Sequence, residues 1–204
     1  MYRSAKYPTD LAEAEAFVAG QRHGTLIATP PGGHPQITLL PFIKDGDEIE
    51  VHMVREDATF AAVCANPRVT FLVSDFLAFS RHDWVDPRDG ARGTLNFRAV
   101  AYSCTATIST DPHDVAATLA RLLRAYEPDA DSYEPIVPGK FYAPRLARLA
   151  AVRLRVLETD AKFKVGPAAP PDVKRRVVAG LRARNEPGDA RAADVIAATL
   201  GDKT

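Results

Sequence analysis

The fold is decided by residues 24–54, which read GTLIATPPGGHPQITLLPFIKDGDEIEVHMV. Three apolar, β-branched runs, Thr25–Thr29, Gln36–Ile43 and Glu48–Val54, alternate with short segments rich in Pro, Gly and Asp. This is the pattern of strands joined by tight turns. Strands joined in this way must pair antiparallel, because a parallel pair needs a long crossover connection. The stretch therefore predicts an antiparallel sheet.

Helices and further strands surround this stretch. A polar segment from Phe79 to Gly93 is rich in turn-forming residues and is interpreted as a functional loop or flap. The chain shows no alternation of strand and helix of the βαβ kind, so the pattern favours a mainly β protein, an antiparallel barrel with added helices. Asp10, Asp57 and Asp111 predict the starts of three helices. The Pro-Pro-Asp sequence at residues 170–172 introduces a fourth helix through Leu181, and a last helix is expected over Ala190–Leu200. Further strands are predicted over Arg68–Asp75, Thr94–Ile108 and Leu146–Leu157.

Composition limits the function classes. The 204 residues allow one domain with a small appendage, and 46% hydrophobic with 25% charged residues is ordinary for a globular protein. The formal net charge is zero, which argues against a nucleic-acid backbone as the main partner. Cys64 and Cys104 are far apart and are expected to be buried thiols, with no metal site. No signal peptide or membrane-spanning stretch is evident, so a cytoplasmic location and no membrane partner are expected.

A candidate anion site lies in residues 49–60, IEVHMVREDATF. A strand is expected to end at Arg55 and a helix to begin two or three residues later. The Arg55 guanidinium, the Thr59 hydroxyl and the free N–H groups of the first helical turn would then converge, which is the chemistry of a phosphate site. The spacing alone also fits an ordinary surface arginine beside a capped helix.

The sequence HMVRED at residues 52–57 resembles the His-Val-Ala-Arg-Ala-Asn signature of PaiB-like FMN-binding proteins, a branch of the pyridoxamine-phosphate-oxidase-like split barrels. Other segments resemble the same family in the same order along nearly the whole chain. These are Met1–Tyr7, Gly24–Leu26, Leu40–Phe42, Thr94–Phe97, Ala161–Lys164 and Val178–Arg182.

The resemblance implies an antiparallel FMN-binding split β-barrel with C-terminal helices, assembled as a homodimer with FMN at the subunit boundary. It implies a barrel domain over residues 1–158 and, over residues 159–204, a Lys-Phe-Lys segment with a two-helix extension packed on the barrel. Arg55 and Thr59 would hold the FMN phosphate, and the segment of Leu39, Leu40, Pro41 and Phe42 would lie along the ring. The other residues implied to approach the cofactor, some of them from the partner subunit, are Trp84, Asn96, Lys162 and Lys164.

His52 lies on the strand before the junction, and two interpretations of it stay open: a core histidine with its bonds satisfied, or a contact to the flavin ring. No catalytic side chain is visible.

Three residues depart from the family pattern. Leu39 stands where the family has His, Asp57 where it has Asn, and Leu95 where it has Trp. A carboxylate near a phosphate dianion lowers affinity, so FMN is expected to bind loosely.

Three functions remain open at this point. The first is a flavoprotein, which includes a flavin-dependent oxidoreductase of unknown substrate, since the cofactor itself would carry the chemistry. The second is a negative transcriptional regulator, the role attached to PaiB. Residues 159–204 carry nine basic and six acidic side chains, so DNA binding is not favoured. The third is a haem protein, with His52 or a histidine of the flap as axial ligand.

Overall fold

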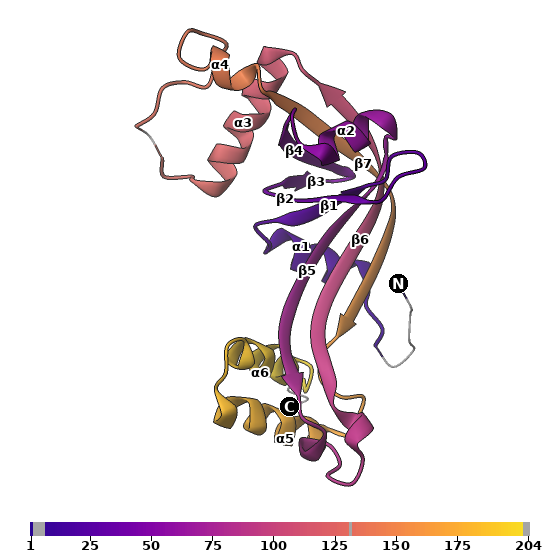
Figure 1. Cartoon of the computed structure of the whole chain (residues 1–204). Coiled ribbons are helices and arrows are strands. Elements are labelled where there is room, and N and C mark those ends of the chain that lie inside the picture. Colours follow the sequence, from indigo (N-terminus) through magenta and orange to yellow (C-terminus); the bar gives the residue numbers. More distant parts are fainter. Residues whose placement is uncertain (2–6, 131, 202–204) are drawn as a thin grey trace. The chain divides into compact units, whose positions relative to one another are not determined.

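The structure is a computed structural model that describes residues 1, 7–130 and 132–201, so residues 2–6 of the Met1–Tyr7 segment lie outside it. Seven strands form one sheet in the order β2-β1-β5-β6-β7-β4-β3 (Figure 1). The strands are β1 (Gly24–Ala28), β2 (Gln36–Leu40), β3 (Ile43–Asp45), β4 (Glu48–Val54), β5 (Arg68–Ser80), β6 (Thr94–Ser109) and β7 (Leu149–Lys164). The α-helices are α1 (Leu11–Ala19), α2 (Ala58–Ala65), α3 (Pro112–Tyr126), α4 (Ala143–Leu146), α5 (Pro171–Arg184) and α6 (Asp189–Ala198), and the 3-10 helices are η1 (His82–Trp84) and η2 (Gly90–Arg92).

Two compact units make up the chain. The first, which we call the barrel unit, comprises residues 15–73 and 101–160. The second, which we call the hairpin unit, comprises residues 1–14, 74–100 and 161–204. The long strands β5, β6 and β7 each contribute residues to both units, and β7 continues through residue 158. The division at residue 158 stays a prediction.

A link of only two residues, Pro41 and Phe42, joins β2 to β3, although these strands lie at opposite edges of the sheet. Three residue steps span at most about 11 Å, so the two edges must approach each other. β2 accordingly contacts β4, the neighbour of β3. The sheet is therefore curved into a barrel that hydrogen bonding does not close.

The predicted single strand Gln36–Ile43 is wrong, because the chain leaves the first ladder at Pro41. Proline has no N–H to donate, and it is found at strand edges and ends. Glycine is needed in the next turn, where Gly46 adopts a φ of 52° and lets Asp45 pair with Glu48.

Alternation along the strands separates an inner from an outer face of the barrel. On β4, Ile49, Val51 and Met53 are fully or almost fully buried. The opposite face of β4 meets α3, where Arg121 binds Glu50 at 2.6 Å. An apolar cluster joins α3, α4 and β7 through Val115, Ala116, Leu146 and Ala151.

Leu146 was expected to begin the last strand, but it is the final residue of α4, and β7 begins at Leu149. The helices predicted at Asp10 and Asp111, in contrast, begin at their capping residues, whereas α5 and α6 have no side-chain cap. Asp10 accepts from the Glu13 N–H at 2.6 Å, and Asp111 accepts from the His113 N–H at 2.8 Å. Cys104 is buried as expected, whereas Cys64 is exposed on α2 and does not join the buried side chains of that helix.

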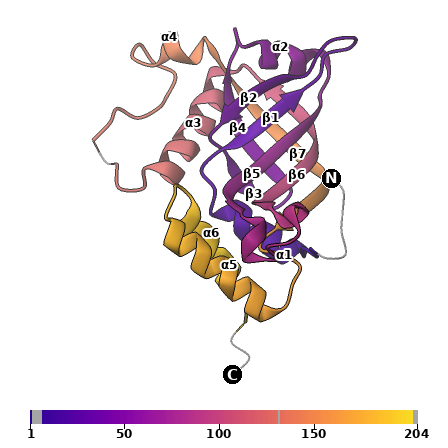
Figure 2. The same cartoon turned by 60° about the horizontal axis from the view of Figure 1, so that its bottom comes forward.

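The hairpin unit is built on α5 and α6, which run side by side (Figure 2). Val177, Leu181 and Ile196 of these helices are fully buried against Leu77 of β5. Trp84 packs so closely against Gly180 that a Cβ there would lie 2.5 Å from the indole ring. Glycine at position 180 therefore permits this contact.

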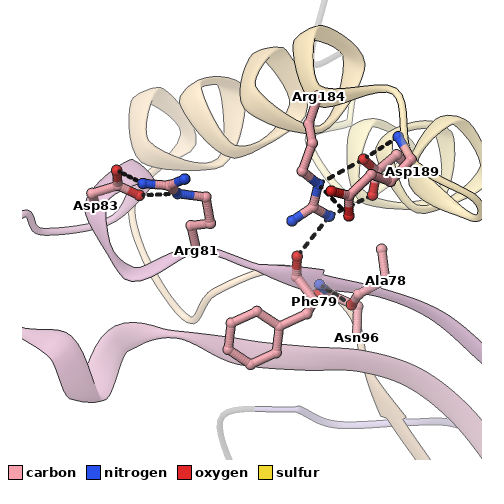
Figure 3. Close-up of polar contacts among 8 residues, drawn as sticks. Ala78, Phe79, Arg81, Asp83, Asn96, Arg184 and Asp189 are labelled. Atoms are coloured by element: carbon pink, nitrogen blue, oxygen red, sulfur yellow. Dashed lines mark hydrogen bonds and ion pairs between the residues drawn. The ribbon is translucent and has the colours of Figure 1, made fainter.

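An ion pair closes the α5–α6 connection. Asp189 has no exposed surface, and its carboxylate lies 2.5 Å from the Arg184 guanidinium. Arg184 also donates to the Phe79 carbonyl of β5 at 2.9 Å, while Asp189 accepts from the Glu186 N–H at 2.9 Å (Figure 3). The hydrogen bond from Arg184 holds the pKa of Asp189 below its usual value.

Substitution of Arg184 by Ala should destabilise the hairpin unit by about 3 kcal/mol, because it leaves a buried carboxylate without its cation. The matched control is Arg182→Ala, whose exposed pair with Asp194 at 3.2 Å should contribute less than about 0.5 kcal/mol. Urea unfolding followed by the fluorescence of Trp84, the only tryptophan, measures both. Equal losses in the two variants would show that the buried pair has no special role.

Candidate functional site

The junction between β4 and α2 places Arg55 at the surface. Its backbone N–H donates to the Arg148 carbonyl at 2.9 Å, and one guanidinium nitrogen donates to the Ala147 carbonyl at 3.1 Å. A guanidinium carries five N–H donors, so most of them remain for a ligand. Arg148 adds a second cation, which lies 3.3 Å from Glu56. The junction thus holds two arginines beside a helix N-terminus.

Asp57 caps α2, as predicted. Its side chain accepts from the Thr59 N–H at 2.6 Å, and α2 ends at the predicted Asn66-Pro67 pair. The N–H groups of Ala58 and Phe60 also lie in the first turn, where no intrahelical carbonyl can reach them. Thr59 is only 2% exposed, so its own chain covers it. The accessible part of the junction is therefore Arg55 with the first-turn backbone.

The Leu39–Phe42 segment lies at the end of edge strand β2. Leu39 is 66% exposed, whereas Phe42 is buried with its ring edge-to-face on Phe71. The Phe42 N–H donates to the Tyr126 hydroxyl at 2.9 Å, and that hydroxyl also contacts the carbonyls of Phe42 and Arg22. Pro41 has no N–H. Neither Pro41 nor Phe42 therefore presents a free amide to a ring.

A cavity of about 430 Å³ opens beside Phe42. The end of α1, Arg22, Lys44 and Tyr126 also line it. Arg22 stacks on the Tyr126 ring, with the guanidinium carbon 5.4 Å from the ring centre, and Lys44 binds Glu15 at 2.7 Å. The volume lies within the range of small-molecule sites.

His52 lies on the face of β4 opposite Val51 and Met53, the face that Glu50 shares. It is half-buried, and its Nδ1 atom is buried without a hydrogen-bond partner among the described residues. Burial lowers the pKa of His52. Among the described residues, the Nδ1 atom thus lacks the partner that a satisfied core histidine would have, and the contact to the flavin ring stays a prediction.

Trp84 and Asn96 of the hairpin unit, which were predicted to approach the cofactor, both have partners within the chain. Trp84 packs on α5 and lies under the Arg184 guanidinium, whose carbon is 5.2 Å from the ring centre. Asn96 is fully buried, and its amide donates to the Ala78 carbonyl at 3.0 Å and to Ser80 Oγ at 2.7 Å. Its oxygen accepts from the Gly166 N–H at 2.8 Å.

The two lysines of the Lys-Phe-Lys segment differ in their surroundings. Lys162 lies over the Phe97 ring, with Nζ 5.9 Å from its centre. Lys164 lines a cavity of about 270 Å³ together with Arg92, Gly93 and Thr94.

The structure brings the predicted residues together in two groups. Leu39, Leu40, Pro41, Phe42, His52, Arg55 and Thr59 belong to the barrel unit, whereas Trp84, Asn96, Lys162 and Lys164 belong to the hairpin unit. Within the barrel unit, α2 packs against β1 and β2.

Sequence reasoning missed Tyr126 and Arg148. Tyr126 is the last residue of an amphipathic helix and gave no signal for its bond to Phe42. Arg148 lies between α4 and β7 and becomes a neighbour of Arg55 only through tertiary packing.

Over the described part of the chain, no three His, Cys, Asp or Glu side chains are grouped to hold a metal ion. No described helix combines the length and apolar character needed to cross a membrane.

Comparison with known families gives one match, which covers residues 1–158 and is described as "Putative FMN-binding domain". The chain belongs to this family. No curated protein is significantly similar in sequence. The match includes both the Leu39–Phe42 segment and the Arg55 junction.

Solved structures share the fold. The FAD- and haem-binding protein from Mycobacterium smegmatis is 16% identical, with a TM-score of 0.61 over 86% of this chain and 80% of that one. The flavocytochrome Anf3 from Azotobacter vinelandii is 17% identical, with a TM-score of 0.59 over 80% of this chain and 76% of that one. The prediction of an antiparallel split barrel with added C-terminal helices is confirmed.

The half-buried His52 should make stability depend on pH near neutrality. The pKa of His52 is lowered in the folded chain, so at pH values below about 6.5 the unfolded chain binds more protons than the folded chain. The free energy of unfolding therefore decreases as the pH falls through this range. His52→Gln should lose less stability than wild type between pH 7.5 and 5.5, measured by urea unfolding. The control His34→Gln, in an exposed turn, should behave as wild type. Identical pH profiles for all three proteins would contradict this assignment.

Proposed function

We propose that this chain is an FMN-binding flavoprotein that holds the phosphate at the β4–α2 junction and the ring beside Leu39–Phe42. The observation that carries the proposal is the family match over residues 1–158. Two similar structures are, by name, a flavocytochrome and an FAD- and haem-binding protein, which supports a flavin in this fold. When bound, FMN supplies hydride or electron transfer.

The residues of the junction fit a phosphate. Arg55 is exposed and keeps donors beyond the one used on Ala147, and the first-turn N–H groups add the positive end of the helix dipole. The Asp57 carboxylate is partly neutralised by its bond to the Thr59 N–H. Thr59 serves chiefly to anchor the turn from within the chain.

The ring would meet apolar side chains in the barrel unit rather than a row of backbone amides. Leu39 is exposed, and the Tyr126 hydroxyl already engages the Phe42 N–H. His52 Nδ1, the buried nitrogen without a partner, offers one polar group to a ligand. The contacts predicted for Trp84, Asn96, Lys162 and Lys164 stay predictions.

We also propose a homodimer that covers the outer face of β2, β1 and β5. Ile37 and Leu39 of edge strand β2 are 60% and 66% exposed. Their antiparallel partners on β1 are Ile27 and Thr25, and Thr25 in turn pairs with Leu72 of β5. These side chains form one apolar patch on an open edge, which in soluble proteins marks an interface. A second copy, related by a two-fold axis, would cover it.

The regulator hypothesis gains little from the structure, because several arginines of α5 and α6 are engaged in ion pairs with acidic residues. Arg176 binds Asp172 at 3.2 Å, Arg182 binds Asp194 at 3.2 Å, and Arg184 binds the buried Asp189. Such pairs leave a weaker basic field for DNA. For haem, His52 is the one barrel-unit histidine with a buried free nitrogen among the described residues. The visible spectrum of the loaded protein separates haem from flavin.

The flavin proposal predicts that FMN binds more tightly than riboflavin, which lacks the phosphate. Arg55→Ala should weaken FMN binding by about tenfold or more, because a charge-assisted hydrogen bond contributes about 1.5–3 kcal/mol, and should leave riboflavin binding unchanged. The control Arg68→Ala removes an exposed arginine just beyond the C-terminal end of α2. Flavin fluorescence titration measures each affinity.

In the same titration series, Asp57→Asn keeps the helix cap and removes a carboxylate from the phosphate site. FMN affinity should rise about fivefold, or about 1 kcal/mol. If Asp57→Asn binds FMN no better and Arg55→Ala binds it no worse, the phosphate does not lie at this junction.

The dimer proposal predicts a mass near twice 22.1 kDa by light scattering at micromolar concentration. Leu39→Lys should shift the protein to monomer, because it places a charge in the apolar patch. Val137→Lys changes a loop residue that is 55% exposed and should stay dimeric. A monomeric wild type would refute the proposal.

A further inference from the structure

A cavity of about 270 Å³ in the hairpin unit gathers positive charge. Arg92 comes from the end of η2, Thr94 begins β6, and Lys164 ends β7. None of the described residues that line this cavity is acidic. The lining of the cavity therefore includes two cations and the hydroxyl-bearing residues Thr94 and Tyr7.

Several other basic residues of the hairpin unit are engaged in ion pairs. Arg81 binds Asp83 at 2.7 Å, Arg98 binds Asp75 at 2.6 Å, and Arg191 binds Asp75 at 2.6 Å. Within the described ranges, in contrast, the side chains of Arg92 and Lys164 form no ion pair. The pKa of Asp86 is lowered chiefly by hydrogen bonds from Arg88, with which it also forms an ion pair at 3.4 Å, and Arg92 makes only the smallest contribution.

Internal bonds hold the walls of this cavity in place. Asn96, two residues after Thr94, accepts from the backbone N–H of Gly166, two residues after Lys164, at 2.8 Å. This bond fixes the start of β6 against the end of β7. On the other wall, the backbone at Gly93 lies against the Phe79 ring, where a Cβ would approach the ring to 2.9 Å. A preorganised site of this kind loses little entropy when it binds.

We propose that this cavity binds a phosphate ester. Arginine offers a planar fork for two phosphate oxygens, lysine adds a point charge, and a threonine hydroxyl can donate to a third oxygen. The volume lies just below the range of sites that enclose whole drug-sized ligands, so the cavity suits a phosphate with the sugar carbons next to it. The ester is either the flavin's own phosphate or that of a second ligand.

The probe is ribose 5-phosphate, with ribose as its uncharged control, titrated into the full chain by calorimetry. Ribose 5-phosphate should bind and ribose should not. Arg92→Gln and Lys164→Gln should each weaken binding by about tenfold, since each removes one charged donor. Arg88→Gln removes a neighbouring charge whose side chain is 90% exposed and should change binding less than about twofold. Trp84 fluorescence verifies that each variant is folded.

FMN titrated into the same variants distinguishes the two sources. If FMN binding weakens in Arg92→Gln and Lys164→Gln and not in Arg55→Ala, the flavin phosphate occupies this cavity, and the β4–α2 assignment fails. If FMN binding weakens only in Arg55→Ala, the cavity serves a second phosphate ester. The proposal is overturned if ribose binds as tightly as ribose 5-phosphate. It is also overturned if Arg92→Gln and Lys164→Gln bind both ribose 5-phosphate and FMN as tightly as Arg88→Gln does.

Discussion

The barrel depends on the two-residue link between β2 and β3. Pro41 ends one edge strand and Ile43 begins the other, so the sheet must curve until its edges almost meet. The bond from the Phe42 N–H to the Tyr126 hydroxyl fixes this link to α3. The same link is the segment that the family resemblance places along the flavin ring, so the strongest geometric constraint of the barrel unit and its proposed ring contact coincide.

Most of the secondary structure could be predicted because local chemistry determines it. Asp10, Asp57 and Asp111 cap the helices that they were expected to begin. Strand ends were less predictable, because tertiary partners decide them. β5 continues past Asp75 to Ser80, since Asp75 is not a turn residue but the shared partner of Arg98 and Arg191. The start of β7 was misplaced for a related reason, as Leu146 is buried among α3 and β7 residues while still helical.

Several residues of the candidate site could be predicted from the sequence, but the residues that they contact in the folded chain could not. The sequence indicated Arg55, a capped helix and the Leu39–Phe42 segment from residues that are neighbours in the chain. It could not indicate Tyr126, at the end of α3, or Arg148, between α4 and β7, which lie about 80 to 90 residues away in the sequence from the residues they contact. It also could not show that Thr59 is covered by its own chain, since burial is a property of the packed helix.

A segment that resembles a family can stabilise the fold, and does not necessarily contact the ligand. Within Thr94–Phe97, Asn96 uses both amide hydrogens on β5 and its oxygen on Gly166, so this residue is explained by structure without any cofactor. Lys164 lies at the other end of the same crosslink and has no such structural partner among the described residues. The bond of Asn96 therefore has a second consequence, because it fixes the backbone close to Lys164, an unpaired lysine that lines the same cavity as Arg92. An unpaired cation on a fixed stretch of backbone at a cavity suits an anion, and it is the feature that separates Lys164 from Asn96.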